Sequence, residues 1–142
     1  MSRKGRAAER GSMSVFTVLF SVAVFLLAGL LVDGGSAINA RLRAADVAEQ
    51  AARAGADQLD VDHLRTTGQA RLLGEDRVCA RADEIVAAQG GDDVTSGSCS
   101  VGQGQAQVTV TVSVRWKAFF LSAVGFPGAE MNGEATAAPE AR

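Results

Sequence analysis

Apolar and polar residues divide the chain into segments of different periodicity, and the first segment is continuously apolar. Residues 13–32 form an uncharged run of 20 residues that is rich in valine, leucine and phenylalanine. As a helix, this run would extend roughly 30 Å, about the hydrocarbon thickness of a bilayer. The hydroxyls of Ser14, Thr17 and Ser21 can bond back to carbonyls of the same helix. The sequence therefore predicts a transmembrane helix over residues 13–32.

A cleaved secretory signal is the alternative for this segment. Signal peptides have an apolar core of about 7–15 residues that ends at an A-x-A-type cleavage site. The run in this chain is longer, and Val32 is followed by Asp33, Gly34 and Gly35. We therefore expect a permanent anchor.

The distribution of charge predicts how this anchor is oriented. Residues 1–10 carry four basic and one acidic side chain, a net of +3, whereas the remaining 132 residues have a net of −5. Basic flanks of a membrane helix stay on the cytoplasmic side. We expect residues 1–12 to be a basic cytoplasmic leader or tip. The chain would cross the plasma membrane once, with residues 33–142 outside.

A second helical pattern follows the anchor over residues 36–60, where alanine, a strong helix former, is frequent. The glycine pair 34–35 predicts a kink where the helix leaves the bilayer. Small residues then recur at helical spacing, which lets another backbone approach closely, at Ala44, Ala48, Ala51 and Gly55. Two interpretations of this stripe stay open. It packs against the protein's own sheet, or it makes a helix–helix contact in an assembly.

The rest of the chain predicts two short helices and a sheet. Helices are expected over residues 62–73 and 76–89, the second ending at a glycine pair. Residues 105–116 alternate valine with threonine and serine, the pattern of a half-buried strand. Shorter strands are expected near residues 98–101 and 129–137, in an outer domain of residues 33–134 with a loose tail over 135–142. The fold class is α+β: a long N-terminal helix, one or two short helices, and an antiparallel sheet of about three strands.

Two cysteines, Cys79 and Cys99, enclose 19 residues and form no CxxC motif. Both fall on the side predicted to be exported, where disulfides persist. A bridge would tie the second short helix to the sheet and stabilise the fold by roughly 3 kcal/mol. Two reduced thiols are the alternative if the topology is inverted.

Few residues offer the chemistry of an enzyme, a metal site or a nucleic-acid interface. The formal charge of −2 argues against nucleic acid as a partner. His63 lies beside Asp60 and Asp62 without a recognisable nucleophile, and is interpreted as a solvated loop residue. The acidic groups lack the spacing of a calcium loop, and two cysteines and one histidine are too few for structural zinc. We expect no catalytic residue, metal or cofactor.

Three ordered features near the N-terminus resemble a known family. Arg10-Gly11-Ser12 precedes the apolar run, Asp33-Gly34-Gly35 follows it, and the Ala- and Arg-rich segment ADVAEQAARAGADQLD comes next. In this order they resemble the TadE/TadG-like family, the pseudopilin-like proteins of Tad (Flp) pilus assembly, over about residues 9–60. The cysteine pair and the late Val/Thr strand match only in outline. The resemblance implies a bitopic, pilin-like membrane protein that is a minor structural component of a pilus or an envelope secretion machine.

The resemblance also implies a processing site. In type IV-pilin-like precursors a peptidase cuts after the Gly that precedes the apolar helix, which here is between Gly11 and Ser12. Such proteins usually carry a Glu at the fifth mature position, where this chain has Phe16. That Glu is tolerated in lipid because it pairs with the new amine of a neighbouring subunit. Its absence favours an accessory protein held in the membrane over a bulk pilin.

Two functions are therefore weighed. The first is a non-enzymatic structural or accessory component of a Tad-type pilus or related secretion apparatus. Its expected partners are membrane lipid and other subunits of that apparatus, with a homo- or hetero-oligomer formed through the N-terminal helix. The second is a membrane-tethered binding module unrelated to pili, which would require a concave, partly apolar site on the outer domain.

Overall fold

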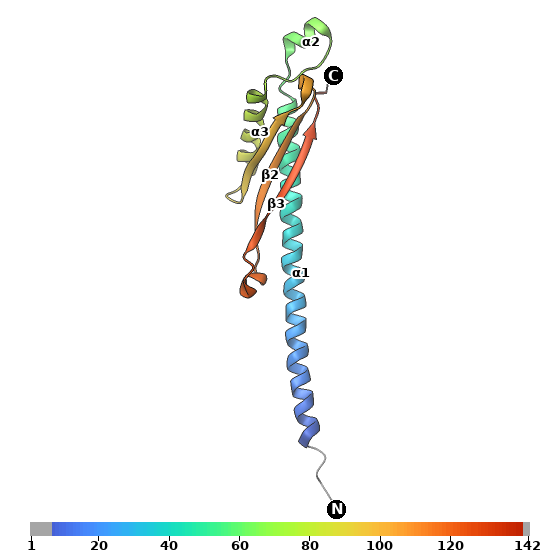
Figure 1. Cartoon of the computed structure of the whole chain (residues 1–142), viewed down its shortest axis with the longest axis vertical. Helices are drawn as coiled ribbons and strands as arrows, with labels where there is room; N and C mark the ends of the chain where they lie inside the picture. The colour runs from blue at the N-terminus through green and yellow to red at the C-terminus, as the bar shows by residue number, and fades with distance from the viewer. Residues whose placement is uncertain (1–6, 141–142) are drawn as a thin grey trace, which may run out of the picture.

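The computed structural model describes residues 7–140, with side chains described from residue 13 onward (Figure 1). Residues 1–6 of the predicted cytoplasmic tip and residues 141–142 of the predicted tail lie outside the described residues. Three α-helices come first in the chain: α1 (Ala7–Ala56), α2 (Val61–Thr67) and α3 (Glu75–Gln89). Three strands and two 3-10 helices follow: β1 (Val94–Val101), η1 (Gln103–Gln105), β2 (Val108–Lys117), η2 (Leu121–Val124) and β3 (Gly128–Ala137).

The three strands form an antiparallel sheet in the order β1-β2-β3, and the second half of α1 and helix α3 cover one of its faces (Figure 1). In β2 the valines and Trp116 are buried, whereas the intervening threonines and serines are not. These polar side chains bond to one another on the open face, for example Thr109 to Thr136 at 2.8 Å and Ser113 to Asn132 at 2.8 Å. The predicted α+β class is confirmed, with β1 longer than expected.

Helix α1 is continuous over all 50 of its residues, so the kink predicted at Gly34-Gly35 is wrong. Glycine in a helix interior costs only about 1 kcal/mol relative to alanine. Helix propagation is cooperative, and strong helix formers stand on both sides of the pair. Asp33 and Ser36, on either side of these glycines, are also fixed by bonds to the end of β2 and the segment after it.

The helix predicted over residues 62–73 is shorter, because α2 ends at Thr67 and is capped by Gly68, which has a φ of 73°. A left-handed glycine is a common helix stop. His63, expected in a loop, lies in the first turn of α2, where its backbone N–H donates to Oδ1 of Asp60 at 3.0 Å. This bond and the guanidinium of Arg71, 2.7 Å from Oδ2, hold the pKa of the Asp60 carboxyl below its usual value.

The strand predicted near residues 129–137 is present as β3, so the loose tail predicted from residue 135 begins only after Ala137. Ala135, Thr136 and Ala137 belong to β3 and pair with Val110, Thr109 and Val108. These residues stay paired with β2 because each pairing gives hydrogen-bond partners to backbone groups that would otherwise lack them. Only residues 138–140 of the described tail carry no regular structure.

The core lies between α1, α3 and the sheet, and its helix side is built from small residues. Val78, Ala82 and Val86 of α3 are buried against Ala48, Ala51 and Ala52 of α1. At Gly133 of β3 the strand comes so close to α1 that a Cβ would overlap the backbone of Ala44 and Ala45. Alanine and glycine thus set a short distance between helix and sheet.

Candidate functional site

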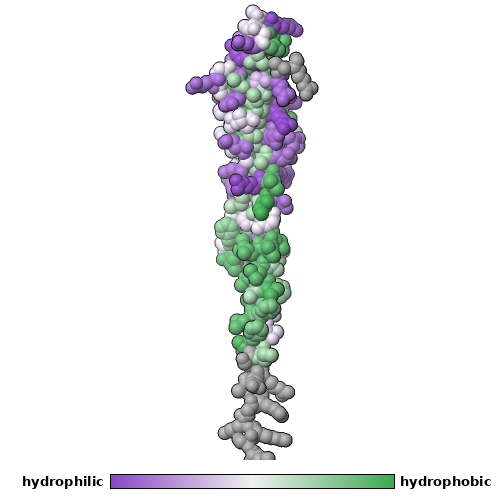
Figure 2. Space-filling model, turned by 90° about the vertical axis from the view of Figure 1, so that its right-hand side faces the viewer, coloured by the Kyte–Doolittle hydropathy of each residue, from purple (hydrophilic) through white to green (hydrophobic). Residues whose placement is uncertain are grey.

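The first half of α1 extends away from the outer domain with its apolar side chains exposed. Figure 2 shows a hydrophobic surface over this half and a largely hydrophilic surface over the outer domain. Among the described residues, one helix, α1, is long and apolar enough to cross a membrane. At the end of its apolar run, residues 118–127 return from the sheet and contact the helix. We call this segment the η2 loop.

Asp33 joins α1 to the η2 loop. Its side chain is fully buried. Oδ1 accepts the backbone N–H of Phe119 at 2.9 Å, and Oδ2 accepts those of Phe120 at 2.9 Å and Leu121 at 2.6 Å. Hydrogen bonds to a carboxylate are stronger than neutral ones. One carboxylate therefore satisfies three consecutive donors of a segment that is 86 to 88 residues away in the chain.

Two further contacts complete this junction. The indole Nε1–H of Trp116 donates to Oγ of Ser36 at 2.7 Å, and Ser36 in turn donates to the carbonyl of Asp33 at 2.8 Å. Phe120 lies directly against Gly29, where an added Cβ would be 2.9 Å from the Phe120 Cβ. Glycine at position 29 is therefore required by close packing. The junction fixes the sheet to the helix beside the apolar run.

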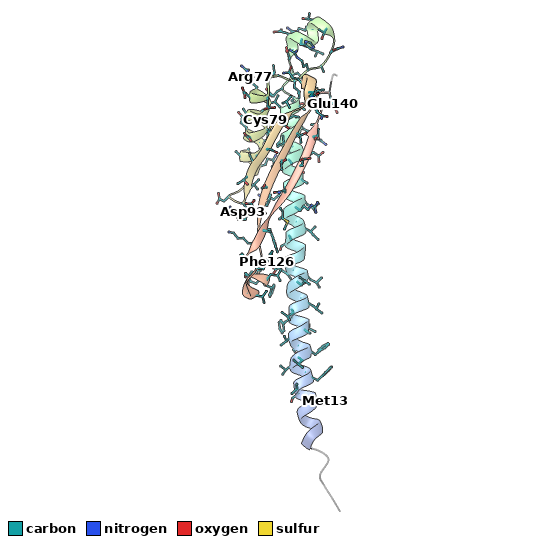
Figure 3. All side chains as sticks on the ribbon, viewed as in Figure 1. Met13, Arg77, Cys79, Asp93, Phe126 and Glu140 are labelled. Atoms are coloured by element: carbon teal, nitrogen blue, oxygen red, sulfur yellow. A yellow bond between two sulfur atoms is a disulfide. The ribbon has the colours of Figure 1, made fainter. Side chains whose placement is uncertain are left out.

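Apolar side chains of the η2 loop point away from the core. Phe119 is 77% exposed and Val124 is 71% exposed, while Phe120 and Phe126 are about half exposed. Figure 3 places Phe126 at the foot of the sheet beside α1, far from Cys79 near the other end of the domain. The ring of Phe126 lies 6.1 Å from that of Trp116, measured between centroids. The loop thus carries an apolar surface next to the anchor segment.

The structure places the residues singled out from the sequence in separate regions. Ala44, Ala48, Ala51 and Gly55 are buried against the protein's own sheet and α3, with a Gly55 Cβ only 3.2 Å from Val78 Cγ1. This burial agrees with the first of the two interpretations of the stripe, packing against the protein's own sheet. The backbone of Gly11 and Ser12 lies within α1, and the structure describes side chains only from residue 13 onward.

The predicted disulfide is present between Cys79 of α3 and Cys99 of β1, with Cα atoms 5.8 Å apart. It ties the helix to the edge strand of the sheet at the point where the β1 register shifts, between Ser96 and Cys99. A bridge of this span restricts the unfolded chain.

We expect loss of this disulfide to lower the free energy of unfolding by about 3 kcal/mol. Non-reducing gels should show faster migration of the native chain. That difference should disappear on reduction and in Cys99→Ser, while the exposed neighbour change Ser100→Ala should keep it. Equal migration with and without reductant would contradict the bridge.

Sequence reasoning missed the three side chains of the junction, Asp33, Ser36 and Trp116. Asp33 was interpreted only as part of a helix break. Trp116 was grouped with the apolar residues 119–121 near the end of a strand and interpreted as core packing, with contact to a membrane surface or a neighbouring subunit as the alternative. One signal was present: a carboxylate directly after an apolar run must find partners or water. The sequence gives no indication that those partners are the N–H groups of residues 119–121.

Two hollows on the outer domain are relevant to the second function weighed, a binding module with a concave site. The larger, about 470 Å³, lies between the end of α1 and β3 and is lined largely by charged side chains, including Glu49, Arg53, Asp57 and Glu140. The second, about 420 Å³, lies at the foot of the sheet beside the η2 loop and includes Trp116 and Pro127.

In the described residues no group of three or more His, Cys, Asp or Glu is placed to hold a metal.

The arrangement defines a class: an α+β protein with one candidate membrane-spanning helix, a small antiparallel sheet on its second half, and a disulfide. Residues 11–58 match the model of the Tad family, TadE/G-like proteins of Flp pilus assembly. This match confirms the resemblance over about a third of the chain and covers most of α1. No curated protein and no solved structure matches the chain. Together the apolar helix and the family match indicate a pilus-related component with a membrane anchor.

Proposed function

We propose that this protein is a non-enzymatic accessory subunit of a Tad-type pilus or related secretion apparatus. It would be held in the plasma membrane by residues 13–32. The observation that carries the proposal is the family match over residues 11–58, which coincides with the apolar run and the part of α1 packed on the sheet. The protein would hold an outer domain in a fixed position relative to the bilayer, because one uninterrupted helix connects the two.

Its contact with other subunits is assigned to the part of α1 between the apolar run and the buried stripe. Ile38 and Leu42, one helical turn apart, are each 63% exposed and flank Arg41. Apolar side chains at this spacing suit the face of a neighbouring helix. The buried stripe of Ala44, Ala48, Ala51 and Gly55 is already occupied by the protein's own domain, whereas Ile38 and Leu42 stay exposed.

The test is complementation of a gene deletion, made in a strain that assembles the pilus when the gene is intact. The wild-type chain should restore surface pili, and the double variant Ile38→Ser with Leu42→Ser should reduce them several-fold. Val61→Ser, an exposed apolar position on α2, is the matched control and should restore them fully. Full restoration by the double variant would contradict the assigned contact, and normal pili in the deletion strain would contradict the role in assembly.

Orientation is tested separately. The basic residues before the helix and the disulfide beyond it both support a cytoplasmic N-terminus and an outer domain. Alkaline phosphatase, which folds only when exported, is expected to be active when fused after Glu140 and inactive when fused before Met13. The reverse result would invert the topology and remove the compartment argument for the disulfide.

The residue at which the mature chain begins distinguishes an accessory subunit from a fibre subunit. Because Phe16 stands where a processed pilin carries Glu, we propose that the chain keeps residues 1–11 as a cytoplasmic tip and stays anchored in the membrane. The intact mass of the detergent-extracted protein measures this. A mass that begins at Ser12 would instead place the cut between Gly11 and Ser12, and a fibre role would follow.

A further inference from the structure

We propose that the η2 loop is a second membrane-contacting element, with its apolar side chains in the outer-leaflet lipid beside α1. The first argument is depth. Phe120 packs against Gly29, which lies three residues before the end of the apolar run at Val32. At 1.5 Å per residue, Gly29 is about 4.5 Å inside that end. If residues 13–32 fill the hydrocarbon, the base of the Phe120 side chain lies within its outer edge.

The second argument is the composition of the loop. Residues 118–129 contain no charged side chain. Phe119, Val124 and Phe126 present exposed apolar surface next to the exposed surface of α1, so the two form one continuous apolar region. Water exposure of such a region is unfavourable by about 25 cal/mol per Å², and contiguous apolar patches mark membrane or protein contacts.

The third argument is that the backbone of the loop is already satisfied. In a bilayer, a backbone N–H without a partner costs several kcal/mol, so segments at that depth bond internally. Asp33 accepts the N–H groups of Phe119, Phe120 and Leu121. Four more N–H groups, those of Ala118, Ala123, Gly125 and Phe126, bond to carbonyls within the loop. The loop therefore exposes side chains and few free donors, as an element in lipid must.

Charged groups lie where lipid headgroups would meet the domain. Lys117 and Arg115 precede the loop on β2 and are exposed, while Trp116 between them is buried against Ser36. Basic residues near a bilayer surface attract anionic headgroups. Lipid is favoured over a second protein copy because the patch is continuous with the span itself. Two contacts, the helix and the loop, would then fix the tilt of the outer domain.

The experiment uses the full chain in vesicles of phosphatidylcholine with a minority of phosphatidylglycerol. A nitroxide is attached at Val124→Cys, and the native cysteines stay bridged and unlabelled. Collision rates with oxygen, which enriches in lipid, and with a water-soluble nickel chelate measure its environment. Thr66→Cys on the exposed side of α2 is the aqueous control, and Phe20→Cys within the apolar run is the lipid control.

We expect the Val124 label to be several-fold less accessible to nickel than the Thr66 label and more accessible to oxygen, at every protein-to-lipid ratio. Nickel access equal to that of Thr66 would overturn the proposal. Shielding that disappears when the protein is diluted with lipid would assign the patch to a second copy and would also overturn it. The Phe20 label tests the anchor on its own: if it lies in lipid and Val124 does not, only the loop assignment fails. Labelling at Phe119→Cys repeats the measurement should Val124→Cys not fold.

Discussion

Asp33→Ala is expected to lower the free energy of unfolding of the outer domain by about 4 kcal/mol, because it leaves three partly buried donors without an acceptor. Each unsatisfied buried N–H costs about 1–3 kcal/mol, and some of that cost is recovered as the η2 loop moves toward water. Trp116 is the chain's one tryptophan and is bonded to Ser36 beside Asp33, so its fluorescence reports this transition directly. Denaturant titration of the full chain in detergent measures the effect.

Two further variants are compared with Asp33→Ala, one expected to be intermediate and one that serves as the control. Asp33→Asn keeps one carbonyl acceptor but turns an amide N–H toward the loop donors, so we expect an intermediate loss. Asp46→Ala removes an exposed carboxylate from the same helix and should change stability by less than about 0.5 kcal/mol. Hydrogen exchange at Phe119, Phe120 and Leu121 should accelerate in Asp33→Ala and not in Asp46→Ala. Equal stability of the two alanine variants would contradict a structural role for Asp33.

Gly133→Ala is expected to lower the free energy of unfolding by more than about 3 kcal/mol, beyond most single overpacking changes. The added Cβ would overlap the backbone of Ala44 and Ala45, and it would be 2.6 Å from the carbonyl oxygen of Ala44. Flexible side chains can turn away, but helix and strand backbones can only separate. Separation would open the core that Val110 and Val112 form with Ala48.

Gly35→Ala is the matched control for Gly133→Ala. A Cβ at Gly35 meets nothing within 4 Å, and the residue lies inside α1 on its exposed side. The same chemical change there should stabilise the helix by up to about 1 kcal/mol. Denaturant midpoints of the two variants, measured in the same detergent, should therefore move in opposite directions. A Gly133→Ala midpoint equal to that of the wild type would contradict the close approach of β3 to α1.

The pattern of residues predicted the elements whose formation depends on local signals. The run over residues 13–32, the alternation in β2 and the helix that ends at Gln89 are each visible within one window of sequence. The end of α2 was wrong because a single residue, Gly68, stops the helix early. The loose tail predicted from residue 135 was wrong because the predicted strand, paired with β2, keeps Ala135 to Ala137 in the sheet. The kink at Gly34-Gly35 failed because cooperative propagation outweighs two glycines.

What the sequence by itself determined was the apolar anchor, the α+β class, the cysteine pair and the likeness to a pilus-assembly family. The first three follow from composition and spacing, which act over one or two turns or strands, and the likeness rests on the resemblance of three ordered motifs near the N-terminus. Only the tertiary structure decided the role of Asp33, the need for glycine at positions 29 and 133, and the burial of the stripe at Ala44 to Gly55. The physical reason is distance along the chain. Asp33 meets its donors 86 to 88 residues later, and no local pattern encodes which backbone groups a buried carboxylate will find.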